Sequence, residues 1–157
     1  MNIAFSKTSI GKIGIAEAAG KITNVYFATD IIPSALELKE TALLRDAFQQ
    51  LNAYLKGTLK AFSLPIAPAG TIFRQQVWQL LDNIPYGTTA TYKDIAIALG
   101  NPQSVRAVGQ ANQQNPIPLF IPCHRIISSN GKLVGYRGGL AIKATLLEME
   151  KQGLANP

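Results

Sequence analysis

The sequence of 157 residues contains very few of the residues that bind metals or form disulfides: one cysteine, Cys123, and one histidine, His124. Structural zinc and iron–sulfur sites use about four cysteine or histidine ligands, so two such residues cannot build one. A disulfide within the chain is excluded because it requires a second cysteine. We therefore expect a protein with no metal and no cofactor.

Charged residues and long apolar segments are also scarce. Only 15% of the residues are charged, and no apolar run approaches the roughly 20 residues that a membrane-spanning helix needs. The first segment carries Lys7 and Lys12 without an unbroken apolar stretch between them, which argues against a secretory signal. A single free thiol suits the reducing interior of a cell. The sequence predicts a cytoplasmic protein with no membrane partner.

The charged residues that are present are mostly basic. Fifteen Lys and Arg against nine Asp and Glu give a net charge of +6 and a pI near 9.6. An excess of positive charge favours an anionic partner such as nucleic acid. Because many small proteins are basic without binding DNA, the charge alone does not identify the partner.

A change of composition at residues 64–70, Leu-Pro-Ile-Ala-Pro-Ala-Gly, is typical of a linker. It predicts a supporting domain over residues 1–68 and a second domain over residues 69–157. Short apolar runs at 13–16 and 25–28 predict a small antiparallel sheet in the first domain. A helix should follow the sheet, with one apolar face made by Leu44, Phe48, Leu51 and Leu55.

The second domain has the pattern of a helix-turn-helix. Apolar residues at helical spacing over 73–81 predict a first helix that ends before Pro85-Tyr86-Gly87. Thr91 and Asp94 form a capping-box pattern at the start of the next helix, which Gly100-Asn101-Pro102 should end. A further short helix begins near Ser104. Two short helices joined by a tight turn are the arrangement that presents the second helix to a nucleic-acid groove.

This second helix has two different faces. Its inward face should carry Val105, Val108 and Ala111, and its outward face Arg106, Gly109 and Gln110. A glycine inside a helix costs about 1 kcal/mol relative to alanine. Close approach to a DNA backbone and close contact with another helix both explain Gly109, and the sequence does not separate them.

Cys123 and His124 place the only thiol next to the only side chain that accepts a proton near neutral pH. A lone cysteine is often a small buried hydrophobe, but cationic or proton-accepting neighbours make a thiol reactive. Adjacent residues on an extended strand point to opposite faces, so the pair requires a bent backbone or a bridging water. A last helix over 140–152 should bury Leu140 and Leu147, and either Glu148 or Glu150 could orient His124.

These residues together form a signature. Pro122-Cys123-His124-Arg125-Ile126-Ile127, with Asn115-Pro116 before it and Gly138-Gly139-Leu140-Ala141 after it, resembles the O6-alkylguanine-DNA alkyltransferase family. The likeness extends over about 70–150 and includes the 73–78 segment, Tyr92 and Arg106-Ala107-Val108-Gly109. It implies an α+β protein. A ribonuclease-H-like sheet-and-helix domain would precede a mostly helical, winged or helix-turn-helix-like domain that binds DNA and carries the catalytic residues.

The resemblance implies a single-turnover DNA repair transferase. In it, Cys123 accepts a methyl or larger alkyl group from O6 of guanine in double-stranded DNA, after the nucleotide has flipped out of the helix. The likeness makes His124 the base that removes the thiol proton through a water and Glu150 the carboxylate that holds it, which leaves Glu148 at the surface. Asn115 would brace the active-site turn, and Tyr92 would donate a proton to the departing guanine.

The likeness also assigns DNA contacts. Arg106 would fill the gap left by the flipped nucleotide, and Ala107, Gly109 and Gln110 would face the minor groove together with Tyr92. The base pocket would be formed by the loop of Tyr136, Arg137 and Gly138 and by backbone groups of Cys123 and Ile126. Arg137 departs from the family, in which this position holds a small hydroxyl residue. The family's N-terminal zinc site, present in some members, has no ligands here.

Two other functions are compatible with parts of the sequence. Non-catalytic lesion-binding relatives share the scaffold but replace the cysteine, so Cys123 argues against that function. A cysteine hydrolase would need an oxyanion hole, which no feature of the sequence identifies. We expect a monomer. Cooperative binding to DNA, the range of alkyl groups and the repair of O4-alkylthymine are left open.

Overall fold

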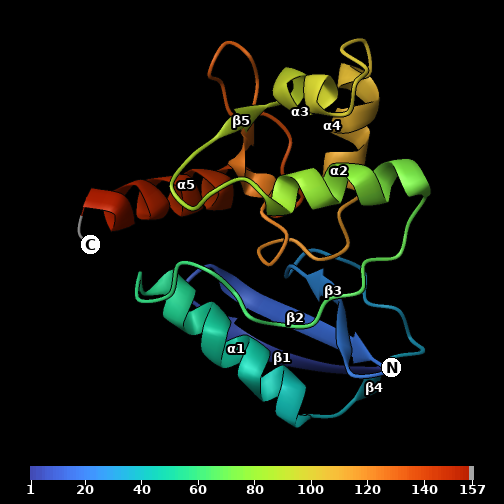
Figure 1. The fold of residues 1–157 in the computed structure, drawn as a ribbon. Coiled ribbons are helices and arrows are strands. Elements are labelled where there is room, and N and C mark those ends of the chain that lie inside the picture. The colour runs from blue at the N-terminus through green and yellow to red at the C-terminus, as the bar shows by residue number, and fades with distance from the viewer. Residues whose placement is uncertain (156–157) are drawn as a thin grey trace. The chain divides into compact units, whose positions relative to one another are not determined.

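The computed structural model describes residues 1–155 (Figure 1). The chain divides into two compact units, with the boundary between Ala69 and Gly70. The first unit is a sheet covered by one helix, and the second consists mainly of helices. The chain is therefore an α+β protein, as the sequence predicts.

The first unit contains a four-stranded sheet with the order β3-β2-β1-β4. The strands β1 (Asn2–Thr8), β2 (Gly11–Ala18) and β3 (Lys21–Tyr26) are antiparallel neighbours, which confirms the predicted antiparallel sheet. The strand β4 (Glu37–Leu38), which pairs in parallel with β1, is not predicted from the sequence. A pairing of two residues leaves too little periodicity in the sequence to be predicted.

The helix α1 (Ala42–Leu55) lies against this sheet (Figure 1). It begins where the Thr41 side chain accepts a hydrogen bond from the Leu44 backbone, an N-cap that satisfies one of the free amides of the first turn. The predicted helix is confirmed, but its buried face is shifted. Phe48 and Leu55 are only half-buried, and the residues at the centre of the contact are Leu44, Ala47, Leu51 and Tyr54.

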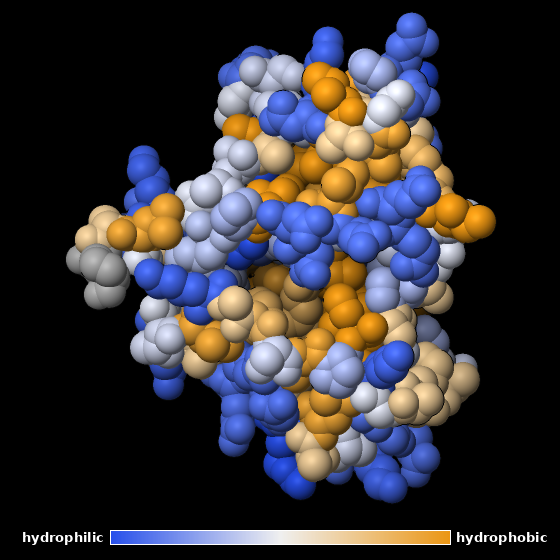
Figure 2. Space-filling model, viewed as in Figure 1, coloured by the Kyte–Doolittle hydropathy of each residue, from blue (hydrophilic) through white to orange (hydrophobic). Residues whose placement is uncertain are grey.

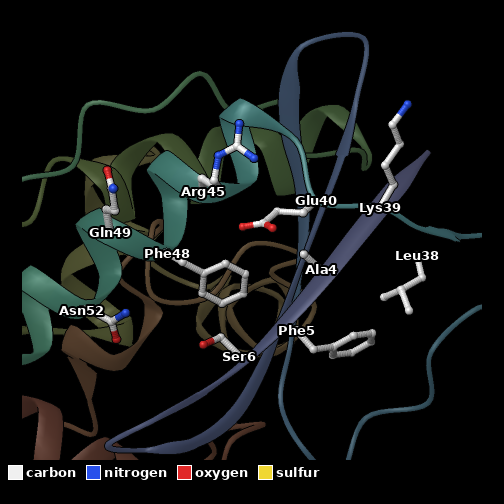
Figure 3. Close-up of a pocket in the computed structure, with 10 residues that line it drawn as sticks. All are labelled: Ala4, Phe5, Ser6, Leu38, Lys39, Glu40, Arg45, Phe48, Gln49 and Asn52. Carbon is white, nitrogen blue, oxygen red and sulfur yellow. The ribbon is translucent and has the colours of Figure 1, made fainter.

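The outer edge of β1 is paired over only part of its length. The Lys39 amide donates to the Ile3 carbonyl over 3.0 Å, so the odd-numbered residues of β1 turn their backbone groups toward this edge. Beyond Ile3 no strand within residues 1–155 pairs there, which leaves Phe5 and Lys7 on an open edge. A groove of about 520 Å³ lies beside it, with Phe48 and Asn52 of α1 facing Ser6 of β1 across it (Figure 3).

The second unit contains the predicted helix-turn-helix. The helix α2 (Ile72–Asp82) precedes α3 (Tyr92–Ala98), which begins with the expected capping box between Thr91 and Asp94. The helix α4 (Val105–Gln113) follows after a turn, with Ser104 as its N-cap residue. The Trp78 indole of α2 donates to the Ala111 carbonyl of α4 over 2.8 Å. This buried hydrogen bond fixes α4 on the core of the unit.

Two further elements complete the unit. The strands β5 (Ala90–Thr91) and β6 (Ile126–Ile127) pair in parallel, which brings the segment after Cys123 beside the start of α3. The helix α5 (Leu140–Ala155) is longer than predicted. The expectation that it buries Leu140 and Leu147 is wrong: Leu140 is 48% exposed and Leu147 is half-buried, and the buried residues are Lys143, Leu146 and Glu150. No helix within residues 1–155 is long and apolar enough to cross a membrane.

Candidate active site

The segment that leads to the cysteine is held by Asn115. Its side-chain amide donates to the Ile121 carbonyl over 2.9 Å, and its oxygen accepts from the Ile117 amide over 3.0 Å. The side chain is 2% exposed, so both contacts are made away from water, where an unmade hydrogen bond is costly. Within this turn Leu119 has a left-handed backbone with φ of 75°. Asn115 therefore has the geometry expected of a brace.

Cys123 and His124 lie in a 3₁₀ turn, Cys123–Arg125, rather than on an extended strand. The Cys123 amide donates to the Ile121 carbonyl over 2.8 Å, which curls the backbone just before the turn. The cysteine is 5% exposed and the histidine 0%. Of the two arrangements considered from the sequence, the structure shows the bent backbone.

Glu150 of α5 is the acceptor around which the histidine is organised. Its Oε2 lies 2.7 Å from His124 Nε2, and the Gly87 amide donates to Oε1 over 3.0 Å. Arg125 donates to the same carboxylate through Nε over 2.8 Å and through Nη2 over 3.1 Å. Several donors, one of them cationic, keep a carboxylate ionised. Glu148 is exposed, so Glu150 is the carboxylate at the histidine.

This arrangement fixes the tautomer of His124. An ionised carboxylate only accepts hydrogen bonds, so Nε2 must carry the proton that it donates to Glu150, and the neutral ring has its lone pair on Nδ1. Burial lowers the pKa of His124, and the Glu150 carboxylate opposes this effect. The ring is therefore neutral near pH 7 and able to accept a proton.

The electrostatics of the thiol differ from what its basic neighbours suggest. Burial raises the pKa of Cys123, and it outweighs the opposing effects of the Asn115 hydrogen bond and of the Arg137 and Lys143 charges. Near pH 7 the side chain is thus a neutral thiol. A group that reacts as a thiolate must then lose its proton during the reaction, and His124 is the adjacent neutral base.

The cysteine lines a small cavity of about 10 Å³ together with the predicted pocket residues Tyr136 and Arg137. Arg137 donates from Nη1 to the Asn115 carbonyl over 3.3 Å, which ties the loop to the braced turn. Gly138 and Ile126 are not among the residues that line the cavity. A volume of this size holds about one water molecule, so the structure shows the pocket in a closed form.

Tyr92, at the first position of α3, is connected to the same loop. Its hydroxyl donates to the Val134 carbonyl over 3.2 Å. Burial raises the pKa of this phenol, with a smaller contribution in the same direction from Cys123. The phenol therefore keeps its proton over the whole neutral range, as a proton donor must.

The outward face of α4 has the expected composition. Arg106, Ala107 and Gln110 are exposed, and Figure 2 shows polar residues at the outer tips of the second unit, around α3 and α4. Val105 departs from the prediction, because it is 36% exposed instead of packed inward; its place at the first position of the helix leaves it beyond the core. The buried residues are Val108, Ala111 and Asn112.

Gly109 is not required by the packing around α4. A methyl group added there would meet only the Tyr92 ring, at 3.8 Å, which is an ordinary contact distance. The sequence left two explanations for the glycine at this position. The structure does not support the one in which another helix packs closely against it.

Both units match family models. Residues 72–152 match the 6-O-methylguanine DNA methyltransferase DNA binding domain, and residues 1–68 match the ribonuclease-like domain of the same enzymes. The chain belongs to the 6-O-methylguanine DNA methyltransferase family. Within residues 1–155 of this family member, no three His, Cys, Asp or Glu residues form a group that could hold a metal ion.

Individual relatives agree with the family assignment. The constitutive methylated-DNA–protein-cysteine methyltransferase of Bacillus subtilis is 45% identical over 153 residues, which cover 93% of each chain. That of Methanosarcina barkeri is 50% identical over 117 residues, 74% of each chain. The crystal structure of Mycobacterium tuberculosis OGT in complex with DNA matches with a TM-score of 0.93 and 38% identity, and covers 98% of this chain and 94% of the other.

Two buried cations of this methyltransferase family member, Arg125 and Lys143, were not among the site residues predicted from the sequence. Arg125 forms the fork to Glu150 and also donates to the Ile84 carbonyl over 2.6 Å. Lys143 is 0% exposed and donates to the Val134 carbonyl over 3.0 Å, and burial lowers the pKa of this lysine. Arg125 directly follows the Cys-His pair, which was an available signal, whereas nothing local marks Lys143 as buried.

Proposed function

We propose that this protein repairs DNA by direct reversal, as a single-turnover methyltransferase. It would take a methyl or larger alkyl group from O6 of guanine in double-stranded DNA onto Sγ of Cys123. The bond between O6 and the alkyl carbon breaks while the bond between that carbon and sulfur forms. The proposal is carried by one observation: a buried thiol in a tight turn with a neutral histidine whose Nε2 lies 2.7 Å from a buried carboxylate.

In this mechanism His124 is the base. The thiol proton passes to Nδ1, directly or through a water, as sulfur attacks the alkyl carbon. The ring then becomes a cation next to Glu150, whose charge stabilises it. Because the product is a thioether, which does not release the alkyl group, each molecule acts once.

Tyr92 would supply a proton to the departing base. The electron pair of the broken bond stays on the guanine, and a hydrogen bond from the phenol offsets the negative charge that develops there. The phenol donates to the Val134 carbonyl in the structure. To donate to a base instead, the hydroxyl has to give up this bond, for which a rotation of its hydrogen is sufficient.

DNA would bind at the exposed face of α4. Arg106, Ala107 and Gln110 are exposed there. The protein has room for a methyl group at position 109 but carries a glycine, and the missing methyl group would let a DNA backbone approach closely. Flipping a nucleotide costs a few kcal/mol, least for a damaged base, and Arg106 would fill the space that it leaves. The complex with DNA of the Mycobacterium tuberculosis relative supports DNA as the partner. We expect the protein to work in the cytoplasm as a monomer.

The first experiment is mass spectrometry of the intact protein and its peptides after incubation with duplex DNA that carries one O6-methylguanine. We expect one methyl group on the Cys123 peptide, at one per molecule. Cys123→Ser should abolish the transfer and still bind the DNA. A wild-type protein that binds the lesion but stays unmodified would instead be a non-catalytic lesion-binding protein. A protein that hydrolyses an ester substrate repeatedly and gains no methyl group would be a cysteine hydrolase.

A further inference from the structure

One buried polar atom in the cavity of the thiol has no hydrogen-bond partner among residues 1–155. Asn112, in the last turn of α4, is 2% exposed and lines the cavity next to Cys123, Tyr136 and Arg137. Its amide nitrogen is within 3.5 Å of the Cys123 carbonyl. Its oxygen, Oδ1, is buried and receives no hydrogen bond from any group within residues 1–155.

The orientation of this amide follows from the carbonyl next to it. A carbonyl oxygen only accepts hydrogen bonds, so the nitrogen of Asn112 must face Cys123 and the oxygen must face away from it. A buried acceptor without a donor destabilises a folded protein. Leucine branches at the same carbon as asparagine and carries no polar atom, so it would avoid this cost. The cavity has room for about one water molecule beside this oxygen, and a donor that arrives with a ligand could take the place of that water.

The proposed substrate has one group that fits. In an O6-alkylguanine N1 carries no hydrogen, and N3 and N7 are acceptors, so the 2-amino group supplies the only N–H donors of the base. This group has two hydrogens. The Cys123 carbonyl and Asn112 Oδ1 are two acceptors near the cavity, on either side of the Asn112 amide nitrogen, which lies 3.5 Å from that carbonyl.

We propose that Asn112 determines the specificity for guanine by accepting a hydrogen bond from the 2-amino group of the flipped base. This inference rests on the proposed function and names the part of the substrate that the site recognises. It implies that O6-methylhypoxanthine, which lacks the amino group, is a poorer substrate. O4-methylthymine, which has no N–H donor, should gain nothing from Asn112.

The test compares two duplexes that differ at one position, with O6-methylguanine in one and O6-methylhypoxanthine in the other. The rate constant of methyl transfer to Cys123 is measured for each, and their ratio is the readout. We expect Asn112→Leu to lower the guanine-to-hypoxanthine ratio by between about 5-fold and 100-fold, through a slower reaction with guanine. Because wild type and variant meet the same two duplexes, differences in base pairing cancel.

The control is Gln114→Ala, which removes an exposed amide two residues further along and should keep the wild-type ratio. Asn112→Ala serves as a second variant in case leucine impairs folding. Equal slowing of both reactions by both variants would show a purely structural role and overturn the inference, as would a wild-type ratio of one. Failure of the wild type to take a methyl group from either duplex would instead overturn the proposed function.

Discussion

Glu150 combines two tasks that usually fall to separate residues. Its carboxylate receives His124 on one oxygen and Gly87 on the other, and the guanidinium of Arg125 spans both. The same group thus neutralises a buried cation and would stabilise the protonated form of His124, the proposed base. Removing one member of a buried ion pair typically destabilises a protein by 3–5 kcal/mol. A change at Glu150 therefore affects stability and chemistry together, and an experiment must measure both.

Glu150→Gln should slow methyl transfer by roughly 10- to 100-fold at pH 7, because the histidine loses the charge that stabilises its protonated form. The pH profile gives an independent readout. The carboxylate raises the pKa of His124, so its loss should lower that pKa further and shift the acid limb of the rate profile to lower pH. The measurement is the transfer rate against pH, at a temperature where thermal denaturation shows the variant folded.

The matched control is Glu148→Gln, which changes an exposed carboxylate of the same helix and should leave the rate and the acid limb in place. A folded Glu150→Gln protein with a wild-type profile would show that His124 is not the base.

At the scale of elements, α4 has a glycine that the protein does not need for packing. Alanine at position 109 would make one ordinary contact, 3.8 Å from the Tyr92 ring. Alanine is more favourable than glycine inside a helix by up to about 1 kcal/mol. The glycine therefore keeps the helix less stable than it could be, which is expected where the outer face of the helix has to approach a partner closely.

Gly109→Ala should raise the melting temperature by about 2–4 °C and weaken binding to duplex DNA. Thermal denaturation gives the first quantity, and a fluorescence titration with a labelled duplex gives the second. A lower melting temperature would mean that packing requires the glycine after all. Unchanged DNA affinity together with higher stability would rule out close approach at this position.

Elements marked by local signals were predictable from the sequence. The capping box at Thr91 and Asp94 located the start of α3, because the two hydrogen bonds depend on residues only three positions apart. The inner face of α5 was not, since apolar residues occur on several sides of this helix and the buried Lys143 breaks the pattern. The unpartnered oxygen of Asn112 was also out of reach, because it depends on where the Cys123 carbonyl lies in space. The sequence indicates Cys123 and His124 as candidate catalytic residues, but it does not indicate the buried groups around them.

At the scale of the whole molecule, the excess of positive over negative charge is larger in the second unit than in the first. From Gly70 onward the chain has eight Lys and Arg against four Asp and Glu, and the first unit has seven against five. Two of the cations in the second unit, Arg125 and Lys143, are buried. The exposed excess is therefore modest, which predicts DNA binding that weakens with salt but has few phosphate contacts.

The open edge of β1 has a consequence for how the protein behaves at high concentration. Strand edges with free amides and carbonyls are templates on which a second chain can add, and proteins often protect such edges with lysine. Lys7 lies on this edge and is exposed.

Lys7→Val should therefore accelerate aggregation on mild heating, which light scattering measures, without changing the reactivity of the thiol. Lys56→Val, an equal loss of charge beyond the end of α1, should not, so that equal aggregation of the two variants would point to net charge. The ammonium group of Lys7 would then protect the open edge of β1 against aggregation for as long as the protein has not yet reacted with a lesion.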